Sequence, residues 1–316
     1  MAMDHKRRVT LTVGAALVLA GALVGPAAAT YPGDVGRLAF AMTGPGGNND
    51  IYTALPNGKN LRRLTTDPGF DACAAYSADG QHIAFCSNRT GAFEIWAMDK
   101  NGGGQHAVTN TGGYAEFPDY SPDGRKIAFD GFQGSDPFDE IYVVNAANGG
   151  GLTALTSCAG FGAGCFNSYP AWSPDGRRIV FIHADDSDGD GNAINEQVWV
   201  MSANGSNMTQ LTFGPASHDQ TPDWSPDGRK IAYMEDGHIF TMRADGTHQT
   251  QLTFGDGFDF GAAWSPDGRK IAFVRNLGGG NRPVFVMNAD GSNQHQLTPG
   301  TPRQSVPAWQ PLGGDD

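Results

Sequence analysis

Six copies of one sequence unit, one of them split between the two ends of the chain, constrain this fold more than any other feature. Three short marks recur in a fixed order. The first joins an aliphatic residue, Ala or Val, and an aromatic residue: Leu38-Ala39-Phe40, Ile83-Ala84-Phe85, Ile127-Ala128-Phe129, Ile179-Val180-Phe181, Ile231-Ala232-Tyr233 and Ile271-Ala272-Phe273. The second is a β-branched residue before an aromatic: Ile51-Tyr52, Ile95-Trp96, Ile141-Tyr142, Val198-Trp199, Ile239-Phe240 and Val284-Phe285. The third is an aliphatic residue before Thr: Leu64-Thr65, Val108-Thr109, Leu155-Thr156, Leu211-Thr212, Leu252-Thr253 and Leu297-Thr298.

A fourth mark is an aromatic residue that precedes a tight turn, and its copies are displaced relative to the others: Tyr76, Tyr120, Trp172, Trp224, Trp264 and Trp309. The first unit lacks this mark, and the copy at Trp309 stands alone near the C-terminus. We therefore expect residues 306–309 to supply the strand that the first unit is missing. They would pair with the strand at residues 37–41 and join the two ends of the chain in one sheet.

The distance between these aromatic residues is 40 to 52 positions, which leaves room for four short strands in each unit. Radial repetition of four-stranded sheets at this period is typical of a β-propeller. A linear solenoid would need polar capping repeats and no split unit. The sequence predicts an all-β fold: a six-bladed β-propeller of four-stranded blades over residues 30–316, closed by pairing of the C-terminal strand with the first blade.

Tight turns follow the aromatic marks. Their sequences are Ser-Pro-Asp-Gly at 121–124, 173–176, 225–228 and 265–268, and Ser-Ala-Asp-Gly at 77–80. Pro presets φ, Asp bonds its own backbone, and Gly accepts a positive φ. These aspartates are therefore expected to be structural.

The chain contains four cysteines: Cys73, Cys86, Cys158 and Cys165. An even count in an exported chain suggests disulfides. If Tyr76 faces Ile83 across its hairpin, the same register places Cys73 opposite Cys86 and predicts a cross-strand disulfide. The other two cysteines lie in one loop and would staple it.

The N-terminal residues 1–29 have the pattern of a secretory signal peptide. Basic residues precede an apolar run, and an Ala-x-Ala site follows, so cleavage is expected after Ala29. The alternative is a membrane anchor, but the run is short and rich in Ala and Gly. We expect a protein that is exported to the periplasm, the cell envelope or the exterior.

The charge of the chain limits its partners. The formal net charge is -12 at pH 7, and removal of residues 1–29 makes it -14. Such a field repels nucleic acid and anionic membranes and favours cations or basic partners. We expect no nucleic-acid partner and no stable membrane insertion.

The repeats resemble those of the TolB-like, WD-repeat-like β-propeller family, as in PAWSPDGRRIVF at 170–181 and its near copies at 118–129, 222–233 and 263–273. The resemblance covers residues from about Arg37 to Pro311. It implies a propeller that binds or scaffolds, although the same repeats occur in lids of serine peptidases and in some polysaccharide lyases. TolB carries an α/β domain before its propeller and works in a cell-envelope complex. Here only a few residues separate the expected leader from the first strand.

Loops that enter the innermost strands share one face of a propeller with the connections between second and third strands. The position five residues before each aromatic mark lies in such a loop and holds Asp71, Ala115, Asn167, Asp219, Asp259 and Gln304, with Glu116 beside Ala115. Clustered oxygen ligands at this channel mouth suit a hard cation such as Ca²⁺ or a bound ligand. The alternative is that these side chains cap backbone groups of adjacent strands.

An acidic insertion at residues 183–197 is a second candidate for calcium binding. Its spacing resembles the start of a calcium loop, and its expected ligands are Asp186, Asp188, Asp190, Asn192 and Glu196. Gln197 stands where a calcium loop has its closing Glu, so this is no EF-hand. The alternative is a solvated acidic loop.

Enzyme motifs are few. A metal-assisted lyase or hydrolase that acts on a carbohydrate or small molecule would use His218 with Asp259 at the channel mouth. Loop aromatics are candidate anchors for a protein or glycan, or else covers for blade ends: Phe70, Phe93, Tyr114, Phe132, Phe138, Phe166, Phe258 and Phe260. The function that we expect first is an exported binding or scaffold module stabilised by calcium, without turnover.

Overall fold

The computed structural model describes residues 31–134, 138–159, 165–185, 195–214, 218–299 and 304–313. The predicted leader, residues 1–29, lies outside these ranges. The described residues form β-strands and turns and contain no α-helix. Nowhere in these ranges is there a helix with the length and apolar character needed to cross a bilayer.

The strands are short and follow one another along the chain. The first twelve are β1 (Asp34–Thr43), β2 (Asn49–Ala54), β3 (Arg62–Arg63), β4 (Asp71–Tyr76), β5 (His82–Ser87), β6 (Glu94–Asp99), β7 (His106–Ala107), β8 (Tyr114–Tyr120), β9 (Lys126–Phe132), β10 (Glu140–Asn145), β11 (Thr153–Ala154) and β12 (Phe166–Trp172). The others are β13 (Arg178–Asp185), β14 (Asn195–Ser202), β15 (Thr209–Gln210), β16 (Asp219–Trp224), β17 (Lys230–Glu235), β18 (His238–Arg243), β19 (Thr250–Gln251), β20 (Phe258–Trp264), β21 (Lys270–Asn276), β22 (Val284–Asn288), β23 (His295–Gln296) and β24 (Ala308–Leu312).

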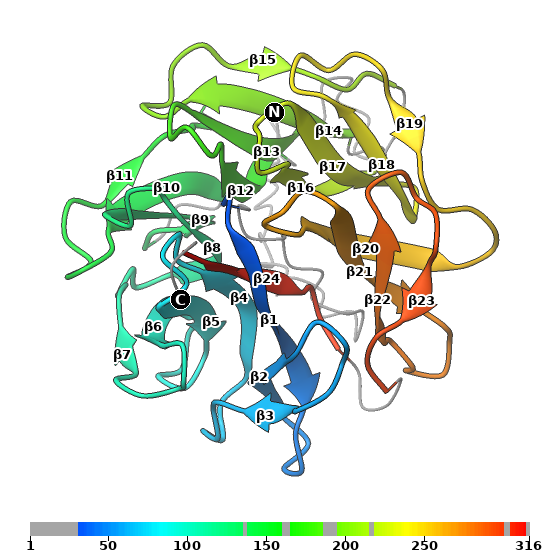
Figure 1. Ribbon diagram of the computed structural model, residues 1–316. Helices are drawn as coiled ribbons and strands as arrows, with labels where there is room; N and C mark the ends of the chain where they lie inside the picture. The colour runs from blue at the N-terminus through cyan, green and yellow to red at the C-terminus, as the bar shows by residue number, and fades with distance from the viewer. Residues whose placement is uncertain are drawn as a thin grey trace, which may run out of the picture.

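Six four-stranded antiparallel sheets surround a central axis as blades (Figure 1). Blade 1 is β24-β1-β2-β3, and blades 2 to 6 are β4–β7, β8–β11, β12–β15, β16–β19 and β20–β23. The strand nearest the axis comes first in each blade. The predicted six-bladed propeller is confirmed.

The closing strand β24 pairs with β1, with Trp309 opposite Leu38 and Ala308 opposite Ala39 (Figure 1, red beside blue). This confirms the split unit. The indole Nε1 of Trp309 donates a hydrogen bond of 3.1 Å to the carbonyl of Ala263 in blade 6. The side-chain amide of Gln310 donates to the carbonyl of Gly80 in blade 2 at 2.9 Å. One strand therefore connects three blades.

The threonine of the third mark makes the same hydrogen bond in all six blades. The hydroxyl of each threonine accepts a hydrogen bond of 2.8 to 2.9 Å from the backbone N–H of the β-branched residue of the second mark. These threonines are buried. Because the mark ties the short outer strand to the start of the third strand, it recurs in every unit.

The turn aspartates are structural, as expected. In the five turns after the aromatic marks, the Ser hydroxyl donates to the Asp carboxylate at 2.5 to 2.7 Å. The same carboxylate accepts the backbone N–H two residues later. Each aspartate is thus used within its own turn.

A bulge corrects the predicted register of the cysteines. In blades 2 to 6 the pairing of the innermost strand with the second strand shifts by one residue. The extra residue adopts a positive φ in each blade: Cys73, Phe117, Tyr169, Thr221 and Gly261. Tyr76 does face Ile83, but beyond the bulge Cys86 faces Ala72 and not Cys73.

The two cysteine pairs differ in state. Cys158 and Cys165 form a disulfide. Cys73 and Cys86 are buried free thiols, although their sulfurs are only 2.6 Å apart. Burial raises the pKa of both thiols and so disfavours the reactive thiolate. A bond between these two cysteines stays a prediction.

Removal of β24 tests ring closure. Truncation after residue 305 should abolish cooperative folding or lower the melting temperature sharply, because blade 1 loses its innermost strand. Truncation after Leu312 leaves β24 intact and is the control. Within the strand, Trp309→Ala should lower the free energy of unfolding by about 3–5 kcal/mol. Urea unfolding measures both, and a β24 truncation as stable as its control would contradict the split blade.

The oxidation state of Cys73 and Cys86 tests the predicted disulfide. A disulfide needs a sulfur separation of about 2.05 Å, so a small shift brings Cys73 and Cys86 into bonding distance. We expect intact mass analysis of protein recovered from an oxidising compartment to show all four cysteines oxidised. The variant that changes both Cys73 and Cys86 to Ser should retain the other disulfide. Free thiols at these two positions in the parent would contradict the prediction.

Candidate functional site

The propeller presents two chemically different faces. The channel-mouth face carries the loops that enter the innermost strands and the connections between second and third strands. Backbone bonds join the two kinds of loop, as between Ala115 N–H and the Phe93 carbonyl at 2.9 Å and between Asp259 N–H and the Gly237 carbonyl at 2.7 Å. The opposite face, called the turn face below, carries the aspartate turns and the turns between third and fourth strands.

Two of the predicted channel-mouth carboxylates bind arginines. Asp71 accepts two hydrogen bonds of 2.9 Å from Arg89, and Asp259 accepts two of 2.7 Å from Arg275. Both aspartates are buried. The Arg89 guanidinium also stacks on the ring of Trp96, with 4.5 Å to the ring centre. Arg275 uses two nitrogens in a bidentate contact, whereas Arg89 directs one nitrogen, Nη2, at both oxygens of Asp71.

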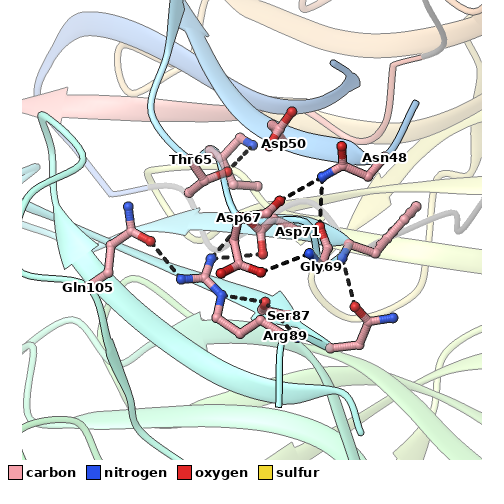
Figure 2. A network of polar contacts seen from close by, with 12 residues as sticks. Asn48, Asp50, Thr65, Asp67, Gly69, Asp71, Ser87, Arg89 and Gln105 are labelled. Atoms are coloured by element: carbon pink, nitrogen blue, oxygen red, sulfur yellow. Dashed lines mark hydrogen bonds and ion pairs between the residues drawn. The ribbon is translucent and has the colours of Figure 1, made fainter. Parts of the chain in front are cut away.

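Glutamines extend these pairs to the neighbouring blades. Gln105 accepts from Arg89 at 2.7 Å (Figure 2). It also donates to the Leu64 carbonyl of blade 1. Gln294 accepts from Arg275 at 2.9 Å and donates to the Leu252 carbonyl of blade 5. Through the arginines and glutamines, both aspartates are connected to the neighbouring blade. These bonds go to arginine side chains and not to backbone groups, so cation binding and backbone capping both stay predictions.

The two amide side chains among the predicted channel-mouth residues, Asn167 and Gln304, also have hydrogen-bond partners within the protein. Asn167 donates to Glu140 at 2.9 Å and lies 2.9 Å from the ring nitrogen Nδ1 of His183. Gln304 donates to the Pro299 carbonyl at 2.6 Å and accepts from the Thr298 hydroxyl. Ala115 contributes only a small buried side chain.

Asp219 lies in an acidic corner of blade 5. Its side chain is 1% exposed, and burial raises its pKa to about 7, with further contributions from Glu235 and Asp236. Burial, followed by Asp236, also raises the pKa of Glu235. Three acids thus crowd one corner of the channel mouth.

Glu116 and Asp130 form a buried carboxyl pair directly opposite each other on β8 and β9. The Tyr114 hydroxyl donates to Glu116, and Asp130 accepts the Tyr169 N–H at 3.1 Å. Burial raises the pKa of Glu116 to about 8 and that of Asp130 well above its usual range. Asp139 adds negative charge to both and itself has a pKa of about 6 because of burial. The pair therefore holds protons near neutral pH.

The weak catalytic candidates have other partners. The His218 side chain is 60% exposed, and its Nδ1 lies 3.4 Å from a carboxylate oxygen of Glu196 in blade 4. Asp259 is bound by Arg275, as described above. The acid next to His218 is thus Glu196 and not Asp259. An isolated parallel β-bridge between Glu196 of β14 and His218, just before β16, brings the two residues together.

The predicted calcium loop lies largely outside the described residues. This applies to Asp186, Asp188, Asp190 and Asn192, whereas Glu196 belongs to β14 and accepts a hydrogen bond of 3.0 Å from Gln220. Within the described ranges no group of three or more His, Cys, Asp or Glu side chains has a geometry suited to a metal ion. Calcium binding stays a prediction.

Several loop aromatics cover blade ends. Phe70, Phe93, Tyr114 and Phe132 form a chain of ring contacts with centres 5.7 to 6.1 Å apart. Phe70 and Phe93 also pack against the buried core. The sequence interpretation missed Phe213 and Phe254, whose side chains are 76% and 70% exposed. Their signal was a Phe directly after the third mark, where the other units have Thr66, Asn110, Ser157 and Pro299.

Tyr31 packs in a buried cluster with apolar residues of blades 3 and 4. It is 3% exposed, and its hydroxyl donates to the carbonyl of Tyr120 in blade 3. Burial raises its pKa, and the charges of Asp119 and Asp223 raise it further. These two aspartates belong to the innermost strands of blades 3 and 5, which flank blade 4.

Comparisons with known proteins agree with this geometry. A family model described as TolB beta propeller domain matches residues 18–136 and 107–238. An uncharacterised protein of Agrobacterium fabrum is 31% identical over 191 residues, which is 60% of this chain and 62% of that protein. A TolB homologue of Chlorobium chlorochromatii is 32% identical over 50% of this chain and 32% of its own length. The chain thus spans only part of these relatives.

A solved structure gives the same fold. The crystal structure of TolB from Acinetobacter baumannii superposes with a TM-score of 0.72 and 21% identity, over 89% of this chain and 68% of that one. At this identity the likeness shows the architecture alone.

The buried Glu116–Asp130 pair predicts a pH-dependent stability. Both carboxyls have a higher pKa folded than unfolded, so the folded protein holds more protons between their unfolded and folded pKa values. The free energy of unfolding therefore falls as pH rises from about 4.5 to about 8. For Glu116, whose pKa rises from 4.5 to about 8, the loss is at most about 5 kcal/mol.

Urea unfolding between pH 4.5 and 8 measures this effect. Glu116→Gln, which imitates the protonated form, should flatten the decline, whereas the exposed control Asp256→Asn should follow the parent. Equal slopes for the parent and Glu116→Gln would show that Glu116 is ionised in the folded protein.

Proposed function

The chain belongs to the TolB beta-propeller domain family, and from this premise we propose that it is an exported binding module that docks a protein partner on its channel-mouth face. The observation that carries the proposal is the pair of exposed phenylalanines, Phe213 and Phe254. They begin the connections that enter blades 5 and 6, so they occupy equivalent positions one blade apart on the channel-mouth side.

Exposed aromatic side chains of this size are suitable anchors for a partner. Burial of one phenylalanine contributes about 1.5–3 kcal/mol to association. Phe258, at the start of β20, is 45% exposed and extends the apolar surface toward the tip of the β17–β18 turn, because its ring packs against Gly237. Aromatic residues dominate the energetics of such interfaces.

The charge of this surface selects a basic partner. Asp219 and Glu235 lie opposite each other on β16 and β17, with Asp236 next along the chain, and burial together with neighbouring acids raises the pKa of Asp219 and of Glu235. Three arginines on the same side, Arg63, Arg89 and Arg275, are already paired with buried aspartates. Lys or Arg side chains of a partner would relieve the repulsion among these acids and speed association.

Export is part of the same proposal. The pattern of residues 1–29 supports it, and so does the disulfide between Cys158 and Cys165, because such bonds persist in oxidising compartments. We place the protein in the periplasm, the cell envelope or the secretome. Calcium binding at Asp186, Asp188 and Asp190 would brace blade 4 next to the docking surface.

Affinity capture tests the docking surface. The protein without residues 1–29 serves as bait for envelope and secreted fractions, and the captured partner is then purified and its affinity measured. The double variant Phe213→Ser and Phe254→Ser should weaken binding by about a hundredfold. The control variant, Leu61→Ser with Met208→Ser, removes exposed apolar side chains of the turn face and should bind as the parent does.

The outcomes separate the parts of the proposal. Binding that survives the phenylalanine double variant would move the docking surface elsewhere, and an empty eluate would contradict the binding module. If calcium braces blade 4, a chelator or Asp186→Asn with Asp188→Asn should lower the melting temperature of the bait. No change in either case would reject the calcium site.

A further inference from the structure

The turn face contains a hollow between blades 4 and 5 whose wall is unusually basic. Its volume is about 550 Å³, and it is lined by the side chains of Arg178, Arg229, Lys230 and Arg243 together with Asp245. Arg178 comes from blade 4 and the other residues from blade 5. The chain has a net charge of -12, so four cations around one hollow make its local charge opposite to that of the whole chain.

The repeats provide an internal control for Arg243. The residue that ends the third strand donates its backbone N–H across the following turn in the same way in six blades, which aligns Leu55, Asp99, Asn145, Ser202, Arg243 and Asn288. Only blade 5 has a cation at this position. The turn geometry does not require it, because an acid, amides and a hydroxyl support the same backbone bond elsewhere.

Arg243 also creates a repulsive pair. It lies directly opposite Lys230 across β17 and β18. The equivalent pairs in other blades are His82 with Asp99, Lys126 with Asn145, Arg178 with Ser202 and Lys270 with Asn288. Like charges directly opposite each other destabilise a sheet. Blade 5 therefore carries a cost that an anion between the two cations would remove.

The nearby acids offset these charges only in part. Asp245 accepts the backbone N–H and the hydroxyl of Thr247 through one oxygen, and these bonds, followed by the charge of Arg243, lower its pKa. Because Asp245 and Arg243 are both exposed, solvent weakens their attraction. Asp227 accepts the Ser225 hydroxyl, and its other oxygen is 3.9 Å from Arg229. Arg178 is held at the hollow by its stacking on Trp224, with 4.5 Å to the ring centre.

Hollows elsewhere on the same face have the opposite character. Between blades 5 and 6 the lining contains Asp227 and Asp267 with Lys230, which thus borders both hollows of blade 5. Between blades 3 and 4 it contains Asp123 and Asp175 with Lys126. The basic hollow is therefore a departure from the repeat and no general property of the face.

We propose that the hollow between blades 4 and 5 is a binding site for a phosphate group, held between Lys230 and Arg243 of blade 5 and Arg178 of blade 4. Arginine presents a fork of donors that matches phosphate oxygens, and lysine adds a compact charge. A phosphorylated small molecule and a phospholipid headgroup offer this same group. The site lies on the opposite face from the proposed docking surface and is independent of it.

Isothermal titration with inorganic pyrophosphate tests the site. The parent should bind one equivalent, and Arg243→Ser, which installs the residue that blade 4 has at this position, should weaken binding by about tenfold or more. The control is Arg269→Ser, which removes one exposed cation from the aspartate turn of blade 6 and should leave the affinity unchanged. Without the ligand, Arg243→Ser should be at least as stable as the parent, because the repulsion with Lys230 is gone.

Thermal unfolding in phosphate gives a second readout. Phosphate stabilises many proteins because it is excluded from their surface, and the control variant measures that non-specific effect. Only an additional rise in melting temperature for the parent and Arg269→Ser, absent in Arg243→Ser, supports a site. Equal responses of all three proteins, or equal pyrophosphate affinities, would overturn the proposal. Cosedimentation with phosphatidylcholine vesicles, with and without phosphatidic acid, distinguishes a headgroup from a soluble phosphate as the source.

Discussion

Closure of the ring by β24 is the constraint on which the rest of the structure depends. The strand pairs with β1, and its Trp309 and Gln310 side chains bond to blades 6 and 2. Without it, blade 1 would expose the edge of β1, and the innermost strands would no longer form a closed wall. Since every predicted channel-mouth residue lies on or next to that wall, closure positions them all.

Comparison of equivalent positions in the six blades distinguishes structural from functional side chains. The threonine of the third mark bonds to the backbone in all six blades, so its recurrence reports architecture. The aspartates bound by Arg89 and Arg275 occur in two blades and clamp neighbours. Phe213, Phe254 and Arg243 perform no such task, and each differs in chemistry from the residues at the equivalent position of other blades. Departures without a structural role are therefore the stronger functional signals.

The sequence predicted the blade number, the split blade and the Tyr76–Ile83 register, because these follow from the spacing of the marks. It could not predict the bulge at Cys73, since the five residues with positive φ share no chemistry and only one of them is glycine. It placed Asp71 and Asp259 at the channel mouth but could not identify Arg89 and Arg275 as their partners. Those arginines lie 16 to 18 residues away along the chain, and only the folded hairpin brings them together.

The two faces present different charged groups because the repeat places different side chains at the two ends of each strand, and the hollow between blades 4 and 5 is a basic exception on the turn face. In four of the five aspartate turns an arginine follows the Asp-Gly pair, with Gln81 in the fifth, and the acid is bonded to its own backbone, as for Arg229 and Asp227. At the channel mouth Arg89 and Arg275 are instead paired with buried aspartates. The acids of blade 5 then determine the electrostatic potential of this face. A basic protein partner and a phosphate group would therefore approach this propeller from opposite ends of its channel axis, and neither would compete with the other.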